Sequence, residues 1–168
     1  SLFVIIFSAP VGLLWLWMNK RKQEPNSVVK FGLGFLMLGA GFYIFKSTLG
    51  FANAEGVTSM EVFTLAWFVI TFGELCLSPI GLSLMTKLSP VKIQGLMMGM
   101  WFLASAYGQY VAGLLGAGMS SDNPLATNYE KLVLYTDGYG QLGLYALISG
   151  IALIAISPLV RKLMRGVH

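Results

Sequence analysis

Five long apolar runs alternate with polar connections along this chain, at residues 2–18, 31–45, 62–86, 93–119 and 138–160. Each run is close to the roughly 20 residues that an α-helix needs to cross a bilayer. The apolar positions are continuous rather than alternating, so a sheet barrel does not fit, and each segment must satisfy its backbone hydrogen bonds as a helix. The pattern therefore predicts an all-α membrane protein with five transmembrane helices.

Composition and charge support this class and add an orientation. The chain is 56% hydrophobic and 11% charged, and its mean hydropathy of +0.73 is far from the balance of a soluble domain. Nine of the eleven basic residues lie on one side of the predicted bundle, namely Lys20, Arg21, Lys22, Lys30, Lys87, Lys92, Arg161, Lys162 and Arg165. The positive-inside rule predicts that this side, with the C-terminus, is cytoplasmic, and that residue 1 lies on the outer side. The net charge of +4 is then a topology signal, not an indication of nucleic-acid binding.

Small residues and one long connection complete the predicted organisation. The chain opens directly in an apolar run without an initiating Met, as expected of a piece of a longer protein. Gly95 and Gly99 form a GxxxG motif, and glycines recur in the second run, so close helix packing is expected at both places. The fourth connection, 120–137, is the longest, and its YEKLVLY segment is a candidate for a short interfacial helix. Tyr139 is expected to anchor the outer membrane border.

One carboxylate lies at the centre of the third run, in the stretch FGELCLSPIG. Glu74 is the thirteenth of the 25 residues 62–86. An ionised side chain at the bilayer midplane costs roughly 2.5–3.5 kcal/mol on insertion scales, so it usually faces a bundle interior or cavity and has a partner. Lys87 is 13 residues away, roughly 20 Å along the helix. The partner must therefore come from a missing segment, a cationic substrate group or a proton; the alternative is a hydrogen bond that joins two helices.

The link between the third and fourth runs is short, which allows residues on the two helices to be matched in depth. Lys87 and Lys92 mark the same membrane border, and Ser78 and Trp101 each lie nine residues from it. These two residues are therefore expected to be level with each other. The match predicts that a hydroxyl and an indole meet near the midplane.

Together these positions predict a polar pocket in the middle of the membrane. Glu74, Ser78 and Leu82 recur at i, i+4 and i+8, close to one face of a helix. Leu82 and Met98 lie nearer the basic border at similar depths. We expect Glu74, Ser78 and Trp101 to form the pocket and Leu82 with Met98 to close it on the cytoplasmic side.

Enzymatic motifs are absent from the sequence. Cys76 is the only cysteine, His168 is the only histidine, and no span holds a second acid that could form a carboxylate dyad. The sequence therefore predicts no metal site, no cofactor and no enzyme activity.

The residues around the predicted pocket resemble one family closely. The segment FGELCLSPIGLSLMTKLSPVKIQGLMMGMWFLASAYG, residues 72–108, is similar to the tenth and eleventh helices of the proton-dependent oligopeptide transporters, a branch of the major facilitator superfamily. The whole chain, 1–168, then resembles the end of the eighth helix through the twelfth. The resemblance implies part of the C-terminal six-helix bundle of a twelve-helix fold.

The resemblance also implies a function and assigns roles. The glutamate that matches Glu74 faces the central cavity, where it pairs with a lysine of the N-terminal half or receives the peptide's amino terminus. Ser78 and Trp101 match substrate-pocket residues, and Leu82 and Met98 match the cytoplasmic gate.

The implied activity is proton-coupled symport of di- and tripeptides across the cell membrane by alternating access, with protons as the coupling ion and the N-terminal half as partner. A non-transporting membrane scaffold and a proton-driven transporter of another small solute remain alternatives.

Overall fold

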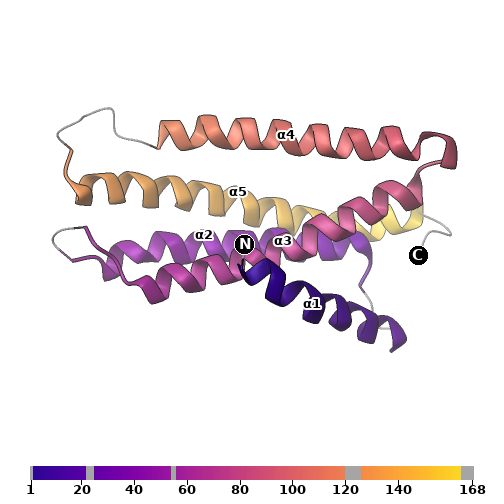
Figure 1. The fold of residues 1–168 in the computed structure, drawn as a ribbon, viewed down its shortest axis with the longest axis horizontal. Coiled ribbons are helices and arrows are strands. Elements are labelled where there is room, and N and C mark those ends of the chain that lie inside the picture. The colour runs from indigo at the N-terminus through magenta and orange to yellow at the C-terminus, as the bar shows by residue number, and fades with distance from the viewer. Residues whose placement is uncertain (1, 22–24, 54–55, 120–125, 164–168) are drawn as a thin grey trace.

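The computed structural model describes residues 2–21, 25–53, 56–119 and 126–163, and this part of the chain is built of helices without strands (Figure 1). The long helices are α1 (Leu2–Lys20), α2 (Ser27–Ser47), α3 (Met60–Leu88), α4 (Gln94–Gly118) and α5 (Asn128–Leu163). Two short 3-10 turns, η1 (Thr48–Phe51) and η2 (Val91–Ile93), follow α2 and precede α4. The predicted all-α class is confirmed.

Three of the helical segments are long and apolar enough to cross a membrane by themselves: Ser27–Phe51, Met60–Leu88 and Asn128–Val160. Within α1, the apolar segment Phe3–Met18 is shorter. α4 has 25 residues and no charge, but its glycines, tyrosines and glutamines lower its hydropathy. The five predicted runs thus coincide with five helices of unequal apolar character.

α2 is the centre of the bundle, and its glycines let two neighbours approach closely. Gly34 and Gly41 face α3, while Gly32 and Gly39 face α5. A Cβ on Gly39 would lie 2.7 Å from Leu147 Cγ, so only a glycine fits there without movement. The close packing predicted for the second run is therefore present, and it joins α2 to both α3 and α5.

α5 begins ten residues earlier than the run 138–160 indicated. Thr127 Oγ1 accepts a hydrogen bond from the Glu130 amide (3.3 Å), and Glu130 Oε2 accepts one from the Thr127 amide (2.9 Å). This reciprocal pair is a capping box, which starts a helix by satisfying otherwise unpaired amides. The prediction of a separate interfacial helix at YEKLVLY was wrong, because this segment forms the first turns of α5.

Aromatic side chains fill the contact between α2, α3 and α5. Phe45, Ala66 and Ile70 are buried there. Tyr139 stacks on Phe45 at 5.1 Å and on Phe42 at 6.0 Å between ring centroids. Tyr139, expected at the membrane border, is therefore part of the helix packing.

α1 packs against α3 only along its first turns. Phe3 and Phe7 contact Phe68 at 5.7 and 5.2 Å between centroids, and Phe7 also contacts Phe72 at 5.4 Å. The beginning of α1 therefore lies midway along the bundle (Figure 1). Residue 1, which was expected on the outer side, lies outside the described residues.

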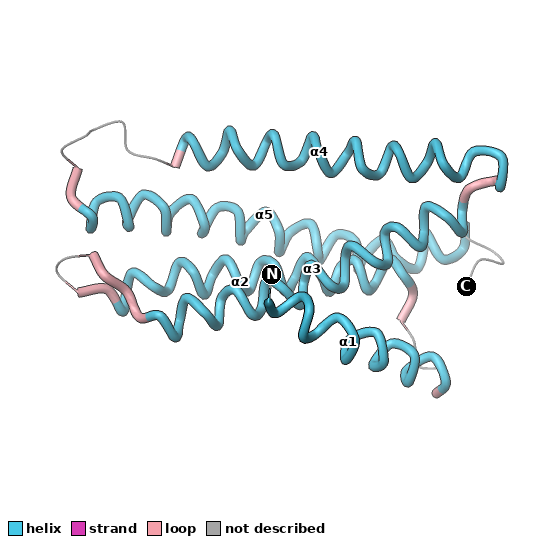
Figure 2. The backbone as a smooth tube through the Cα atoms, viewed as in Figure 1, coloured by secondary structure: helices cyan, strands magenta, loops and turns pink. Residues whose placement is uncertain are grey.

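The basic helix ends gather at one end of the bundle. α1 and α5 end there, α2 begins there, and the link between α3 and α4 crosses there (Figure 2). Lys20, Arg21, Lys87 and Lys92 all belong to these segments. The opposite end holds the α2–α3 and α4–α5 connections.

Candidate functional site

The predicted polar residues of α3 lie among residues that pack in the bundle. Gly73, Leu75 and Cys76 are buried, whereas Glu74, the fifteenth of the 29 residues of α3, is exposed, as is Ser78 one turn later. Leu82, a further turn along, is half-buried. Their spacing of four residues places the three side chains close to one side of α3.

The charge of Glu74 is not compensated by a positive group of the described residues. Within the described residues, no lysine or arginine nitrogen lies within 4.0 Å of its carboxylate. Its neighbour Gly73 packs directly against the backbone of α2, with the would-be Cβ 2.9 Å from the Gly34 carbonyl oxygen. This contact fixes the rotation of α3 against α2.

Trp101 contacts α3 nearer the link than the depth match predicted. Its ring tip lies over Gly81, three residues beyond Ser78, and its ring meets Phe31 of α2 edge-on at 6.3 Å between centroids. The reason is the direction of helical side chains, which tilt toward the N-terminus of their helix, here toward the link. Gly81 supplies the space, because any side chain there would occupy the position of the indole.

The link itself is held by hydrogen bonds. Gln94 Nε2 donates to the Thr86 carbonyl oxygen (2.9 Å), and the Ile93 amide donates to the Pro90 carbonyl oxygen (2.9 Å). The Ser89 hydroxyl donates to the Met85 carbonyl oxygen. The end of α3 and the start of α4 therefore form a connected hairpin.

Beyond this hairpin α4 is not embedded in the bundle. It has no buried residue, and only α3 and η2 make extensive contacts with it (Figure 1). The would-be Cβ atoms of Gly95 and Gly99 meet no atom within 4 Å, so the predicted GxxxG contact is not formed within the described residues. Met98, the predicted partner of Leu82, is half-buried near the start of α4.

Lys30 is a buried cation that the sequence prediction missed. It was expected in the cytoplasmic connection, but it lies in the first turn of α2 and is only 6% exposed. Its Nζ lies 4.5 Å from the centroid of the Trp15 ring, a cation–π contact. The available signal was its spacing, because Lys30 lies four residues before Gly34 on the face that packs against α3.

Among the described residues, no group of three or more His, Cys, Asp or Glu side chains is close enough to hold a metal ion.

Comparison with known proteins identifies the family. A family model described as the POT family matches residues 1–131. The chain is 36% identical over 168 residues to the Bacillus subtilis transporter YclF, covering 99% of this chain and 31% of that protein. It is 31% identical to the peptide transporter YePEPT of Yersinia enterocolitica, with the same coverage.

Solved structures agree. A mutant of the peptide transporter POT superposes with a TM-score of 0.77 at 31% identity, covering 98% of this chain and 30% of that one. Tetrameric PepTSo2 superposes with a TM-score of 0.75 at 28% identity, covering 97% of this chain and 31% of that one.

The fold and these matches define a multi-pass membrane protein of a transporter class. The chain belongs to the POT family. It spans about a third of the length of the relatives it matches.

Proposed function

We propose that the protein containing this chain is a proton-coupled symporter of di- and tripeptides that works by alternating access. The observation that carries the proposal is Glu74, exposed at the middle of a long apolar helix without a positive partner in the described chain. Relatives support the substrate class: one is named a peptide transporter, and another, from Aeromonas hydrophila, is named Dipeptide and tripeptide permease B.

In this proposal Glu74 holds an exchangeable cation. A carboxylate at the midplane costs a few kcal/mol unless a positive group or a proton neutralises it. The peptide's ammonium group, a lysine of the rest of the transporter and a proton can each do this in turn. Because each arrival displaces the previous partner, peptide movement and proton movement become linked at one side chain.

Ser78 and Trp101 line the same proposed site with smaller roles. Ser78 is exposed one turn from Glu74, so its hydroxyl is available for a hydrogen bond to a peptide group, worth about 1 kcal/mol. Trp101 anchors α4 on Gly81 and Phe31. Its remaining exposed surface supplies a wall of the site, so it combines packing and substrate contact.

Leu82 and Met98 form the proposed cytoplasmic gate. Both are half-buried on the hydrogen-bonded hairpin of α3 and α4. Movement of this hairpin as a unit would bring both side chains against the other half of the transporter and close the exit by apolar contact. Gating by one bundle moving against another is the usual behaviour of such transporters.

The remaining parts of the proposal concern partners and location. The partner is the N-terminal six-helix half of the same transporter, the coupling ion is the proton, and no other cofactor is involved. The protein lies in the inner or plasma membrane. Its C-terminus is cytoplasmic, supported by the basic helix ends that gather at one end of the bundle.

The deciding experiment uses Glu74→Gln in the full-length transporter reconstituted in vesicles. The variant keeps size and hydrogen bonding but cannot bind a cation, so uptake driven by a proton gradient should be lost. The matched control is Glu61→Gln, which removes a charge from the exposed first turn of α3 and should leave uptake unchanged.

A competition assay tests whether Glu74 reads the amino terminus. In wild type, a free dipeptide should compete with labelled substrate better than its N-acetylated form. In Glu74→Gln this preference should shrink, because the free amino terminus no longer finds a carboxylate and gains nothing over the acetylated one. Unchanged uptake together with unchanged preference would return Glu74 to a structural role.

The same assays separate the alternatives. A scaffold would show no uptake of any labelled dipeptide by the wild type. A transporter of another solute would show proton movement on addition of that solute but not of peptides.

A further inference from the structure

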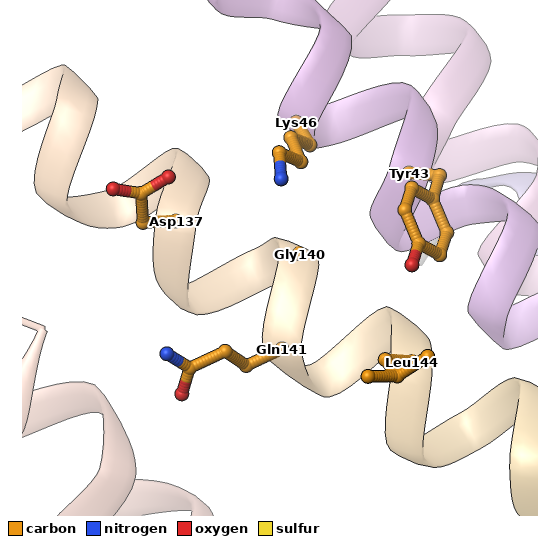
Figure 3. A pocket seen from close by; sticks show the side chains of 6 residues that line it. All are labelled: Tyr43, Lys46, Asp137, Gly140, Gln141 and Leu144. Atoms are coloured by element: carbon orange, nitrogen blue, oxygen red, sulfur yellow. The ribbon is translucent and has the colours of Figure 1, made fainter.

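A cavity lies between α2 and α5 at the end of the bundle opposite the basic helix ends (Figure 3). Its volume is about 320 Å³, at the lower end of the roughly 300–1,000 Å³ typical of small-molecule pockets. The lining residues are Tyr43, Lys46, Asp137, Gly140, Gln141 and Leu144. None of them belongs to the proposed transport site on α3 and α4.

The polar groups of this cavity carry opposite charges that do not neutralise each other directly. Lys46, from the last turn of α2, extends over Gly140 of α5, whose would-be Cβ lies 2.8 Å from Lys46 Cδ. Asp137 and Gln141 succeed each other at i and i+4 on α5 (Figure 3). Within the described residues, Lys46 and Asp137 form no ion pair within 4.0 Å. A cation and a carboxylate thus stand at separate points of one cavity.

An apolar track leaves the cavity along α5. Leu144 lines the cavity, and Ile148 and Ile151 follow at i+4 and i+7, on the same side of the helix. All three are exposed, at 48%, 56% and 61%. The track runs through the middle of the apolar run 138–160. The surface therefore has polar groups at a membrane border and an apolar strip leading inward.

We propose that this cavity binds the headgroup of phosphatidylethanolamine from the leaflet at this end of the bundle. Lys46 Nζ and the Tyr43 hydroxyl would donate to the phosphate. The Asp137 carboxylate and the Gln141 side-chain oxygen would accept from the ammonium group. One acyl chain would lie along Leu144 and Ile148.

The chemistry selects this lipid over the common alternatives. The ethanolamine ammonium donates hydrogen bonds, which a carboxylate and an amide oxygen can accept, and charge-assisted bonds of this kind are among the strongest. The trimethylammonium group of phosphatidylcholine has no donor, and its recognition uses a cage of aromatic rings, whereas one tyrosine lines this cavity. Phosphatidylglycerol carries the same phosphate but offers Asp137 only neutral hydroxyl groups, so it lacks the ammonium that the carboxylate would bind.

The test is native mass spectrometry of the full-length transporter in detergent, incubated with phosphatidylethanolamine, phosphatidylcholine or phosphatidylglycerol of identical acyl chains. The wild type should retain phosphatidylethanolamine preferentially. Lys46→Gln and Asp137→Asn should each lower its apparent affinity about tenfold, the effect of losing one charge-assisted hydrogen bond. Lys46→Arg, which keeps the charge, should retain binding.

Controls distinguish this site from general lipid contact and from soluble ligands. Lys131→Gln removes a charge from the same end of α5 outside the cavity and should leave lipid binding unchanged. Equal retention of the three lipids, a preference for phosphatidylglycerol, or insensitivity to Lys46→Gln and Asp137→Asn would overturn the proposal. Displacement of the lipid by millimolar glycerophosphoethanolamine would also overturn it, because the site would then bind a soluble headgroup. Displacement by a dipeptide would overturn it as well, because the site would then be a substrate site.

Discussion

Trp101 shows at the scale of one residue how a side chain determines the position of a helix. Its ring tip lies on Gly81 and its edge-on contact is with Phe31, while α4 as a whole has no buried residue. The sequence predicted an indole near the polar residues of α3, because depth follows from counting along two helices. It could not predict the contact with Gly81, which depends on the direction in which the side chain leaves its helix.

The contact with Gly81 can be tested without changing the tryptophan. Gly81→Ala places a Cβ where the indole tip lies, so the ring must shift, and overpacking of this kind typically costs about 1–3 kcal/mol. The full-length transporter should melt at a lower temperature in detergent, and the apparent KM for peptide should rise because α4 is displaced. The comparison is Gly12→Ala in α1, where no neighbour lies within 4 Å of the new Cβ. Equal melting of both variants would show that the indole does not depend on Gly81.

At the scale of helices, glycine spacing explains why α2 is central. Gly34 and Gly41 are seven residues apart and face α3, and Gly32 and Gly39 repeat the spacing toward α5. Close packing was predictable from composition, but the assignment of each glycine to a neighbour was not, since it depends on helix rotation. Gly95 and Gly99 are four residues apart, and their would-be Cβ atoms meet no described atom within 4 Å. Small residues therefore indicate that a helix can pack closely, not which helix it meets.

Gly73 offers the sharpest test of this packing. Its would-be Cβ lies 2.9 Å from the Gly34 carbonyl oxygen and 3.1 Å from the Leu38 amide nitrogen, and a backbone cannot move aside as a side chain can. Gly73→Ala should therefore lower the melting temperature of the full-length protein strongly, with a loss of about 2 kcal/mol or more. Gly108→Ala in α4 meets no neighbour among the described residues, so higher helix propensity alone should act, by up to about 1 kcal/mol. A Gly73→Ala protein as stable as wild type would contradict the described α2–α3 contact.

The start of α5 gives a second test at this scale. Thr127→Ala removes the side chain that caps the first turn and should cost about 1 kcal/mol. Hydrogen exchange should become faster at the first amides of α5 while the middle of the helix keeps its protection. Thr64→Ala, which removes an exposed hydroxyl bonded to the Met60 carbonyl oxygen near the start of α3, is the matched control and should not loosen its helix. The TNYE pattern at residues 127–130 was the signal for this cap. A hydropathy count overlooks it, because the polar residues Thr127, Asn128 and Glu130 lie before the apolar run.

At the scale of the whole molecule, the apolar runs predicted the helices because each must satisfy its own backbone in the membrane. The common side of Glu74, Ser78 and Leu82 was predictable for a similar reason, since a helix fixes which residues share a face. The burial of Lys30 was not, because a lysine near a helix start is usually in water, and here the ring of Trp15 replaces part of that solvation. The residues that surround α4 could not be predicted either, because α3 is the one long helix among the described residues that packs against it substantially.

The proposed gate belongs to this largest scale, because it requires the hairpin to move against the rest of the transporter. The hydrogen bond from Gln94 to the Thr86 carbonyl oxygen ties the ends of α3 and α4 together, so the two half-buried side chains Leu82 and Met98 should move together. In a full-length protein with Cys76→Ala, cysteines at Leu82 and at Met98 should react with a cytoplasmic thiol reagent slowly when the transporter is trapped closed to the inside. They should react faster, and by similar factors, when it is trapped open.

A cysteine at Val91, which is 84% exposed in the link, should react equally in both states and reports reagent access. Equal rates at Leu82 and Met98 in the two states would make them ordinary packing residues, whereas a change at only one would show that the hairpin does not move as a unit.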